Sequence, residues 1–377
     1  DRRYLHQYPE IGCDTPKTRE YIEKRLADMG CVASRVGPGL VATVGRGNPV
    51  ILLRADMDAL LMEEESGLPF ASLNPGKAHC CGHDIHTAML LGAARMLKEN
   101  EDSLKGTVKL MFQPGEETGN GALAMIEAGV LEHPKPYAAV AFHVDAALPL
   151  GRLNYSVGPT FCSNDVFTIR VWGKSGHGAR PHQAVDAINA SAHIVTGLET
   201  LIAREAVPTE TCMLTICSIE SDSKVFNVFP KSVTLTGSIR TYNPDQRTCL
   251  VRRLEEVVEG IAGAFHCTGQ VTFDHCQEPL LVDGQLEAEL RGYLEEALGS
   301  EARVAEPPIM KMGSEDFAGV AMRVPSAYFF IGAGPDRENG YPYSQHNPKV
   351  RFNEDMLPLG AAGYAHCACR WLERHGT

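Results

Sequence analysis

The sequence predicts an α/β fold in two parts: a main domain with a mostly parallel, mixed sheet flanked by helices, and an inserted ferredoxin-like α+β domain. Three observations lead to this prediction. A chain of 377 residues is too long for one compact core. Short apolar runs alternate with helical patterns in the first and last parts of the chain. The middle part instead follows a β-α-β-β-α-β order.

The first part of the chain alternates strands with helices. A capping side chain followed by proline, in Asp14-Thr15-Pro16, predicts the start of a helix, and Gly30 closes it. We expect buried strands over residues 41–44 and 50–53, a helix ending near Asn100, and strands over residues 107–112 and 137–142. This alternation is typical of parallel sheets, whose ligands gather beyond the carboxyl ends of the strands.

The middle of the chain has a different pattern. Phe167, Ile169 and Val171 alternate with polar residues, which predicts a half-buried strand. The elements expected next are a helix over residues 184–204, strands over 211–219 and 232–241, a helix over 246–262 and a strand over 270–273. The α/β pattern then resumes with a helix over 286–298, a strand over 326–331 and a helix over 354–374. We therefore expect a discontinuous main domain, residues 1–161 and 277–377, around an inserted domain of residues 162–276.

Composition and charge argue against several classes of function. The balance of 35 Lys and Arg against 47 Asp and Glu gives a net charge of −12, which argues against a general affinity for nucleic acid or anionic membranes. No apolar run approaches the roughly 20 residues that a membrane span needs. Twelve cysteines in a chain too long to need disulfides favour a reducing compartment, so we expect a cytoplasmic protein. The sequence begins at Asp1 and not at a methionine, so the removal of a signal peptide is left as an open alternative.

A short stretch rich in thiols and imidazoles predicts a metal site. Cys81 and His83 flank Gly82, and thiolate and imidazole are ligands that Zn²⁺ and similar ions take. The alternative is a buried thiol beside a helix-capping histidine. Asp84 is expected to accept a hydrogen bond from a ligand imidazole and to fix its tautomer. The remaining histidines of the stretch, His79 and His86, are expected to pack or to start a helix rather than to bind metal.

Two carboxylate pairs follow predicted strands. In Glu116-Glu117 one side chain can hold a metal while the other moves a proton of the water that the metal activates; the alternative is a solvated acidic loop. Asp56, with Asp58, is either a ligand, an orienting carboxylate or part of a loop pair. Since Asp56, Glu116, Glu117 and His143 each lie just past the end of a predicted strand, we expect them at one edge of the sheet. Taken alone, His143 and His346 would each more often be a structural histidine than a metal ligand.

Six motifs carry a resemblance to a known family, and it covers essentially the whole chain. They are Arg54-Ala55-Asp56-Met57-Asp58-Ala59-Leu60, His79-Cys80-Cys81-Gly82-His83-Asp84-Ile85-His86, Gln113-Pro114-Gly115-Glu116-Glu117, Gly173-Lys174-Ser175-Gly176-His177-Gly178-Ala179-Arg180-Pro181-His182, Gly313-Ser314-Glu315-Asp316-Phe317 and His346-Asn347-Pro348. In this order they resemble the metal-dependent amidohydrolases that include hippurate hydrolases, N-acyl-amino-acid amidohydrolases and plant auxin–amino-acid conjugate hydrolases. Carboxypeptidase G and the aminoacylases are more distantly similar.

The resemblance implies a site with two divalent metal ions in the main, catalytic domain. Its ligands would be a bridging Cys81 together with His83, Glu117, His143 and His346. Glu116 would be the general base and acid, and Asp56 would orient a ligand.

The resemblance also implies that the inserted domain is a lid that forms a homodimer. His177 would reach the partner's active site and stabilise the oxyanion there. Asn227 and Arg240 match lid motifs, Arg240 being suited to grip a substrate carboxylate, and Gly313 would contribute to substrate binding. For His177 and Arg240 the alternative is a solvent-facing position at a strand end.

The implied reaction is hydrolysis of the amide bond of a small N-acyl amino acid or peptide-like substrate. A dipeptidase or carboxypeptidase with the same site, and a metal-binding homologue without activity, are the alternatives. A structural zinc module is disfavoured because such sites are closed and richer in cysteine. The donor set favours Zn²⁺ but leaves Mn²⁺ and Co²⁺ open. Cys80, Leu61 and Gly178 depart from the family pattern without removing a ligand or the base, so they bear on substrate choice.

Overall fold

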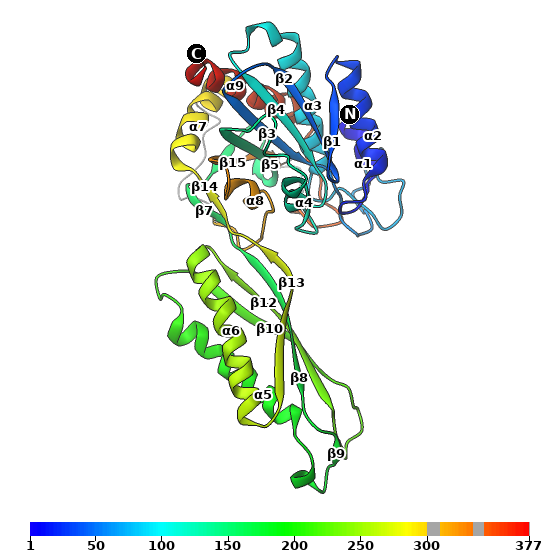
Figure 1. Ribbon diagram of the computed structural model, residues 1–377. Coiled ribbons are helices and arrows are strands. Elements are labelled where there is room, and N and C mark those ends of the chain that lie inside the picture. Colours follow the sequence, from blue (N-terminus) through cyan, green and yellow to red (C-terminus); the bar gives the residue numbers. More distant parts are fainter. Residues whose placement is uncertain (300–309, 335–342, 377) are drawn as a thin grey trace. The chain divides into compact units, whose positions relative to one another are not determined.

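The computed structural model describes residues 1–299, 310–334 and 343–376. The chain forms two compact units, described here one at a time. The larger unit comprises Asp1–Thr160, Leu281–Met310 and Asp316–Thr377, and the smaller one comprises Phe161–Leu280 and Lys311–Glu315. Figure 1 traces the elements of both.

The larger unit is built on a seven-stranded mixed sheet of order β1-β2-β4-β3-β5-β15-β6. Its four central strands run parallel, whereas β1, β2 and β6 pair antiparallel with their neighbours. The bounds are β1 Ala33–Val36, β2 Gly39–Gly45, β3 Val50–Asp56, β4 Thr107–Gln113, β5 Ala138–Pro149, β6 Leu153–Tyr155 and β15 Ser326–Gly334. Every residue of β3, β4 and β15 is buried, as expected for strands covered on both faces.

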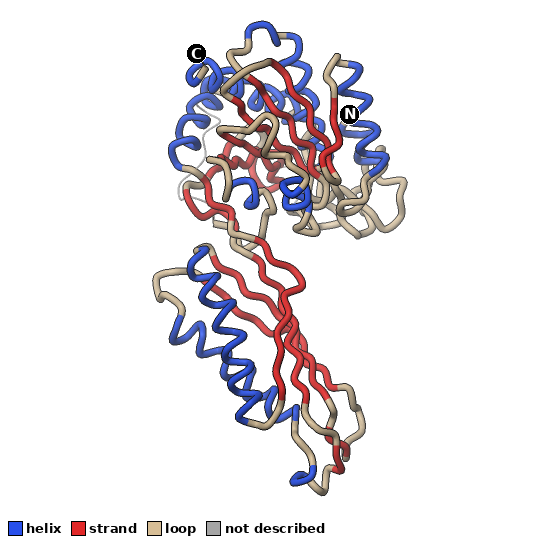
Figure 2. The backbone as a smooth tube through the Cα atoms, viewed as in Figure 1, coloured by secondary structure: helices blue, strands red, loops and turns tan. Residues whose placement is uncertain are grey.

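Helices flank this sheet (Figure 2), and the predicted α/β class with a mostly parallel, mixed sheet is confirmed. The two long helices α3 and α9 pack against each other and against β3, and α7 packs on α9 and β15. The bounds are α1 Arg2–Gln7, α2 Pro16–Asp28, α3 His83–Glu99, α4 Gly121–Glu127, α7 Gly284–Leu298, α8 Ala318–Ala321 and α9 Met356–His375, with a 3₁₀ turn over Glu101–Ser103. The short elements α1, α4 and β1 are not predicted, because so few residues carry no readable period.

The predicted end of the strand that precedes His143 is wrong. The sequence places the end of a strand at residue 142, with His143 beyond it, but β5 continues through His143 to Pro149. The strand continues because β15 pairs with it over Phe330–His143, Ile331–Val144 and further rungs. Asp56, likewise, is the last residue of β3 rather than the first residue after it.

The smaller unit is a four-stranded antiparallel sheet of order β10-β12-β8-β13 with two helices, α5 and α6, on one face (Figure 2). Its elements follow one another as strand, helix, strand, strand, helix, strand. The bounds are β8 Asn164–Trp172, α5 Ala187–Thr200, β10 Cys212–Ser221, β12 Ser232–Thr241, α6 Pro244–Ala264 and β13 Thr268–Gln277. Alternate residues of β8 and β12 pack with the helices in one apolar core.

The remaining elements are short. They are β7 Gly158–Phe161 paired with β14 Leu280–Val282, β9 Gly176–His177 paired with β11 Val228–Phe229, a 3₁₀ turn Pro181–Gln183 and a π-helical turn Leu201–Glu205. The predicted start of a helix at residue 184 is wrong, because Val185 bridges to Lys174 and Asp186 caps the helix that begins at Ala187.

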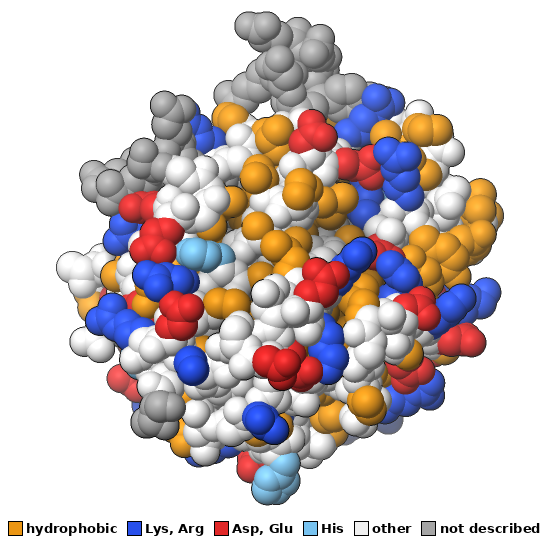
Figure 3. Space-filling model, turned by 90° about the horizontal axis from the view of Figure 1, so that it is seen from above, with side chains coloured by type: hydrophobic (Ala, Val, Ile, Leu, Met, Phe, Trp, Pro, Cys, Tyr) orange, Lys and Arg blue, Asp and Glu red, His pale blue; other side chains and the backbone are white. Residues whose placement is uncertain are grey.

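All twelve cysteines are free thiols. Among the described residues, no helix combines the length and the apolar character needed to span a bilayer. On the face shown in Figure 3, acidic and basic side chains are interspersed among apolar ones.

Candidate active site

The larger unit brings together seven of the predicted site residues. Cys81 and His83 flank Gly82, which precedes the first turn of α3, and Glu116 and Glu117 lie just beyond the end of β4. The other members are Asp56 at the end of β3, His143 in β5 and His346 in the loop before α9. The carboxyl ends of parallel strands thus supply three of the positions, as expected for this class of sheet.

Cys81 is common to two groups of potential metal ligands. Its Sγ lies 3.4 Å from His143 Nε2, and it forms one group with His83 and His143. It forms a second group with Glu117 and His346, whose Oε1 and Nε2 atoms are 3.4 Å apart. In each group the ligand atoms lie within 4.8 Å of one another. The thiol therefore stands between two sets of donors.

Two buried atoms of the site have no hydrogen-bond partner among the described residues: His83 Nε2 and Glu117 Oε1. They are 3.8 Å apart, too far for a hydrogen bond but a suitable separation for two ligands of one ion. Leaving such atoms unpaired in the interior is costly, and a bound cation removes that cost. A thiol, three imidazoles and a carboxylate are also the donor set that zinc and related transition metals take. The residues therefore fit a metal centre.

Backbone carbonyls orient two of the imidazoles. His83 Nδ1 lies 2.9 Å from the carbonyl of Asp58, and His143 Nδ1 lies 2.7 Å from the carbonyl of Val144. Since a carbonyl only accepts hydrogen bonds, each Nδ1 carries the proton and donates it. In the neutral ring, Nε2 is then the nitrogen with a lone pair for a cation.

Asp58 holds the loop of the paired glutamates. Its carboxylate is fully buried and accepts the backbone N–H of Glu116 at 3.0 Å and that of Glu117 at 3.1 Å. Together with its carbonyl bond to His83, this residue touches three predicted site residues. The sequence left Asp58 open between a metal ligand, an orienting carboxylate and a loop residue, and its contacts with the Glu116–Glu117 loop and His83 are those of an orienting carboxylate.

Asp56 lies in a buried polar network. It accepts hydrogen bonds from Arg54 Nη1 at 2.6 Å and from His86 Nδ1 at 2.5 Å, and its Oδ2 is 3.7 Å from His83 Nε2. His86 in turn accepts the N–H of Val144 through Nε2, so both of its ring nitrogens are engaged. The network continues from Arg54 to Gln113 and Asp316.

The partner predicted for Asp84 is wrong. Asp84 accepts hydrogen bonds from Arg2 Nε and His6 Nδ1, each at 2.8 Å, and not from a predicted ligand imidazole. The reason is helical geometry: residues one apart point about 100° away from each other, so Asp84 faces α1 while His83 faces the sheet. His86 and Thr87, three and four residues after His83, share the face of His83 and reach Asp56 instead.

The charges of the site favour a cation. Burial opposes the charged form of His83, but Asp56 and Cys81 outweigh it and hold the pKa of His83 well above its usual range. Burial likewise opposes ionisation of Glu117, and His346 and His83 nevertheless lower its pKa. The Asp56 carboxylate, which favours the protonated form of His83, and the ionised Glu117 would also attract a divalent cation, which competes with protons for the same groups.

His346 is the one predicted ligand that lies far along the chain. Its backbone has a positive φ of 63° and its N–H donates to the carbonyl of Cys80 at 3.0 Å. The Cys80 side chain itself packs in the apolar core, where burial raises the pKa of its thiol to about 12. Cys80 thus anchors the His346 loop by its backbone, and its thiol stays protonated.

The other four predicted site residues belong to the smaller unit. His177 is exposed on β9, next to β11, and the carbonyl of Asn227 accepts the N–H of Gly178 at 2.7 Å, so His177 and Asn227 are neighbours. Arg240 is half-buried and donates to the carbonyl of Met312 at 3.0 Å, beside Gly313. These residues therefore form two separate places within the unit.

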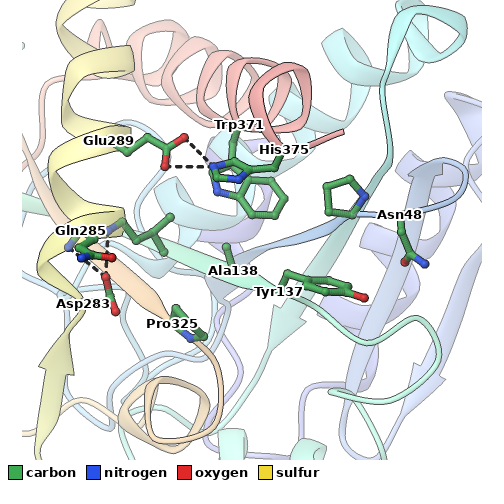
Figure 4. A pocket seen from close by; sticks show the side chains of 11 residues that line it. Asn48, Tyr137, Ala138, Asp283, Gln285, Glu289, Pro325, Trp371 and His375 are labelled. Carbon is green, nitrogen blue, oxygen red and sulfur yellow. Dashed lines mark hydrogen bonds and ion pairs between the residues drawn. The ribbon is translucent and has the colours of Figure 1, made fainter. Parts of the chain in front are cut away.

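A cavity of about 550 Å³ in the larger unit is separate from this site. Figure 4 shows it at the amino ends of β5 and β15, between Trp371 of α9 and Gln285 of α7, with the His375–Glu289 ion pair at its edge. None of the predicted site residues lines it.

Sequence reasoning missed the buried network behind the site. Arg54 stands in an apolar run of β3 and Gln113 is the last residue of the fully buried β4, a signal that these buried polar groups must have partners. Asp316 and His86 carry no comparable signal, since a loop carboxylate and a histidine near a helix start are ordinary.

Known proteins share this fold and these motifs. A model of peptidase family M20/M25/M40 matches residues 52–370. The chain belongs to this family. The M20/M25/M40 enzymes are hydrolytic metalloenzymes that use divalent metals, so the predicted resemblance and the predicted class, a metal-dependent hydrolase, are confirmed.

Three relatives within or beside this family illustrate the similarity. The chain is 37% identical over 380 residues to IAA-amino acid hydrolase ILR1-like 4 of Arabidopsis thaliana, covering 98% of this chain and 84% of the relative. It is 35% identical over 360 residues to N-acetyl-L-cysteine deacetylase of Bacillus subtilis, covering 94% and 83%. A crystal structure of a dinuclear metal-binding M20 peptidase of Bacillus subtilis superposes with a TM-score of 0.81 at 29% identity, covering 99% and 96%.

Proposed function

We propose that this protein hydrolyses the amide bond of N-acyl amino acids or related amino-acid conjugates, releasing a carboxylic acid and an amine. The observation that carries the proposal is the convergence of two donor groups on Cys81, with the carboxylate of Glu116 beside them. The names of two relatives, which describe the hydrolysis of an auxin conjugate and of an N-acetyl amino acid, support this substrate class.

Two divalent ions, Zn²⁺ or Mn²⁺ with Co²⁺ as a further candidate, would polarise the amide carbonyl and lower the pKa of a bound water. Cys81 would bridge them, and the other ligands would be His83, Glu117, His143 and His346. Two observations support this set: the ligand atoms lie within 4.8 Å of one another in each group, and His83 Nε2 and Glu117 Oε1 have no hydrogen-bond partner in the part of the chain that the structure describes.

Glu116 would accept the proton of the attacking water and pass it to the leaving nitrogen. Its Oε2 lies 3.8 Å from His83 Nε2, and its side chain is only 11% exposed, which places a carboxylate beside the donors and largely out of bulk water. Asp58 would hold the loop of Glu116, and Asp56 would set the electrostatics of His83.

Residues 1–161 and 277–377 would then be the catalytic domain, and residues 162–276 a lid through which two chains form a homodimer. His177 would supply a hydrogen bond to the developing oxyanion in the partner's site. Arg240, beside Gly313, would bind the substrate carboxylate with its two-pronged guanidinium, and Asn227, beside His177, would be a further substrate-binding residue. The exposure of His177 and the fixing of Arg240 by the Met312 carbonyl agree with these roles.

A cytoplasmic location is part of the proposal. Twelve free thiols favour a reducing compartment. The acidic balance of the chain disfavours nucleic acid or anionic membrane as a partner.

The substitution Glu116→Gln tests the base. It keeps the size of the side chain and removes the proton acceptor, so kcat should fall by about 10³-fold while both metal ions stay bound, as measured by elemental analysis. Glu63→Gln, an exposed carboxylate elsewhere in the larger unit, is the matched control. Wild-type-like hydrolysis by the Glu116→Gln enzyme would refute the role of this residue.

The main rival is a dipeptidase or carboxypeptidase that uses the same site on peptides. A panel of N-acetyl and N-benzoyl amino acids and dipeptides, each assayed with Mn²⁺ or Zn²⁺ present, separates the two. Higher kcat/KM for the dipeptides contradicts the proposal, and no turnover of any member by the metal-loaded chain indicates a homologue without activity.

A further inference from the structure

Strands β3 and β5 separate at the candidate active site. Their parallel pairing ends at Arg54 and Ala141. On the other side of β3 the pairing with β4 continues to Asp56 and Gln113, and on the other side of β5 the pairing with β15 continues past His143. The sheet therefore opens between these two neighbouring strands while each strand stays paired on its outer side.

A tyrosine hydroxyl lies between β3 and β5 at the start of this opening. Tyr364 of α9 is fully buried; its hydroxyl accepts the N–H of Phe142 at 2.8 Å and donates to the carbonyl of Arg54 at 2.6 Å. In the register of the last pair, Arg54 and Ala141, the N–H of Phe142 faces the carbonyl of Arg54. One hydroxyl thus bonds to both groups at the point where the ladder ends.

Two side chains of α3 bond to the backbone groups further along the opening. The next rung would join the N–H of Val144 to the carbonyl of Asp56. Instead Val144 donates to His86 Nε2 at 2.9 Å, and the Asp56 carbonyl accepts from Thr87 Oγ1 at 2.9 Å. Both side chains are fully buried, and both project from the helix face that also carries His83.

We propose that Tyr364, His86 and Thr87 form a polar wedge that holds β3 and β5 apart and so sets the spacing of the metal ligands. This inference rests on the proposed function for its catalytic meaning. Asp56 lies on the β3 side of the opening and His143 on the β5 side, with Cys81 Sγ 3.4 Å from His143 Nε2. The three wedge residues are positioning residues: they act on the ligands through the two strands.

Satisfied backbone groups make the opening stable. A gap between strands leaves buried N–H and C=O groups without partners, which is strongly unfavourable. The wedge supplies a donor or acceptor for each of the four groups, those of Arg54, Asp56, Phe142 and Val144. Removal of a wedge hydroxyl therefore favours closure of the opening by direct backbone bonding.

The first test is Tyr364→Phe, which removes only the hydroxyl. A crystal structure of the full-length variant should show the N–H of Phe142 closer to the Arg54 carbonyl, with β3 and β5 nearer to each other beyond this pair. Titration with Mn²⁺ alone should show roughly 10- to 100-fold weaker binding of one ion, with a similar fall in kcat and little change in KM. The matched control is Tyr293→Phe, which loses a hydroxyl bond to Glu289 on α7 and should leave Mn²⁺ affinity and kcat within about twofold.

Thr87→Val is the second test, so that the inference does not depend on one variant folding. It removes the bond to the Asp56 carbonyl at nearly constant volume, and the same weakening of Mn²⁺ binding is expected. Thr107→Val is its control, because Thr107 donates to the carbonyl of Gly47 at the opposite ends of the strands.

Three results would contradict the wedge, its positioning role or the proposed function, each independently of the others. Unchanged strand spacing in both Tyr364→Phe and Thr87→Val overturns the wedge. Changed spacing with Mn²⁺ affinity and kcat equal to the controls overturns its positioning role. Absence of hydrolysis in the wild-type chain contradicts the proposed function instead, and the two crystal structures still decide whether the wedge holds the strands apart.

Discussion

Cys81 and Cys80 are adjacent thiols with different surroundings. Cys81 stands between two groups of donors, whereas Cys80 packs among apolar side chains. Burial raises the pKa of both thiols, and a bound metal would favour the thiolate form of Cys81.

The pair gives a prediction with a built-in control. Cys81→Ser replaces the proposed bridge by a weak ligand, so both activity and bound metal should fall, with metal content after dialysis reduced by at least one ion per chain. Cys80→Ala should keep the metal content of the wild type, because its thiol touches no predicted ligand in the described parts of the chain. Elemental analysis of both variants decides, and a Cys81→Ser chain that retains two ions would show that the bridge lies elsewhere.

For single residues, the sequence indicated which side chains lie near the site better than it indicated which partners they contact. Asp56, Glu116 and Glu117 were singled out because each lies at or just past the end of an apolar run, and His83 because it is two residues from Cys81. The partner of Asp84 was not predictable, because it depends on where α1 lies, and α1 is too short to leave a pattern. His346 owes its position to a positive φ and a bond to Cys80, neither of which can be read from a loop sequence.

Among the elements, α1 is held to α3 by a buried ionic cluster. Arg2 and His6 of α1 bind Asp84, and His6 also lies 3.1 Å from Glu64. Burial opposes the charged form of His6, but Asp84 and Glu64 outweigh it and raise its pKa to about 9. His6 therefore donates from both ring nitrogens when protonated, which matches its two carboxylate partners.

This cluster predicts how stability depends on pH. A pKa of about 9 in the fold, above the ordinary value of 6.5, means that His6 stabilises fully below pH 6.5 and that this contribution is lost as the pH rises through 9. The loss is on the order of 3 kcal/mol. Urea unfolding between pH 6 and 9.5 should show it in the wild type and a flatter profile in His6→Gln. Equal slopes for the two chains would contradict the protonated cluster.

The start of α3 depends on a glycine. Gly82 has a φ of 100°, and a Cβ there would lie 2.4 Å from Val144 Cγ2, a buried β-branched side chain that cannot move aside. Gly82→Ala should lower the free energy of unfolding by about 2–4 kcal/mol, from the backbone conformation and the clash together, and should weaken metal binding.

Gly47→Ala separates the two causes. Gly47 also has a positive φ, of 82°, but a Cβ there meets nothing within 4 Å. The Gly47→Ala substitution should lower the free energy of unfolding only by the backbone contribution, about 1 kcal/mol. Chemical denaturation measures both variants, and equal losses would show that the contact with Val144 is unimportant.

Most long elements were predictable and their ends were not. The strand over residues 232–241 and the end of α7 at residue 298 agree with the structure because apolar periodicity defines them. The continuation of β5 past His143 depends on its distant partner β15, and the delayed start of α5 depends on a bridge to Lys174. Such long-range pairing is invisible to any local pattern.

For the molecule as a whole, the central question is whether two chains share their active sites. If His177 acts in the partner's site, a mixture of two inactive chains, Glu116→Gln and His177→Ala, regains activity. Each hybrid dimer has one complete site, so an equal mixture should reach about a quarter of wild-type activity after exchange of subunits.

The same mixture distinguishes the alternative. If His177 serves its own chain, every site in the mixture lacks either the base or the imidazole, and no activity returns. Light scattering on the wild type checks the dimer itself, and a monomer at assay concentration would contradict the proposed role of residues 162–276.

The place of β15 in the main sheet also affects synthesis of the protein. This strand begins at Ser326 yet pairs with β5, which begins at Ala138. While a ribosome is still making the intervening residues, the growing polypeptide carries an apolar strand with one open parallel edge, a template for joining other unfinished chains. Newly made copies therefore need that edge shielded until almost the last strand has emerged.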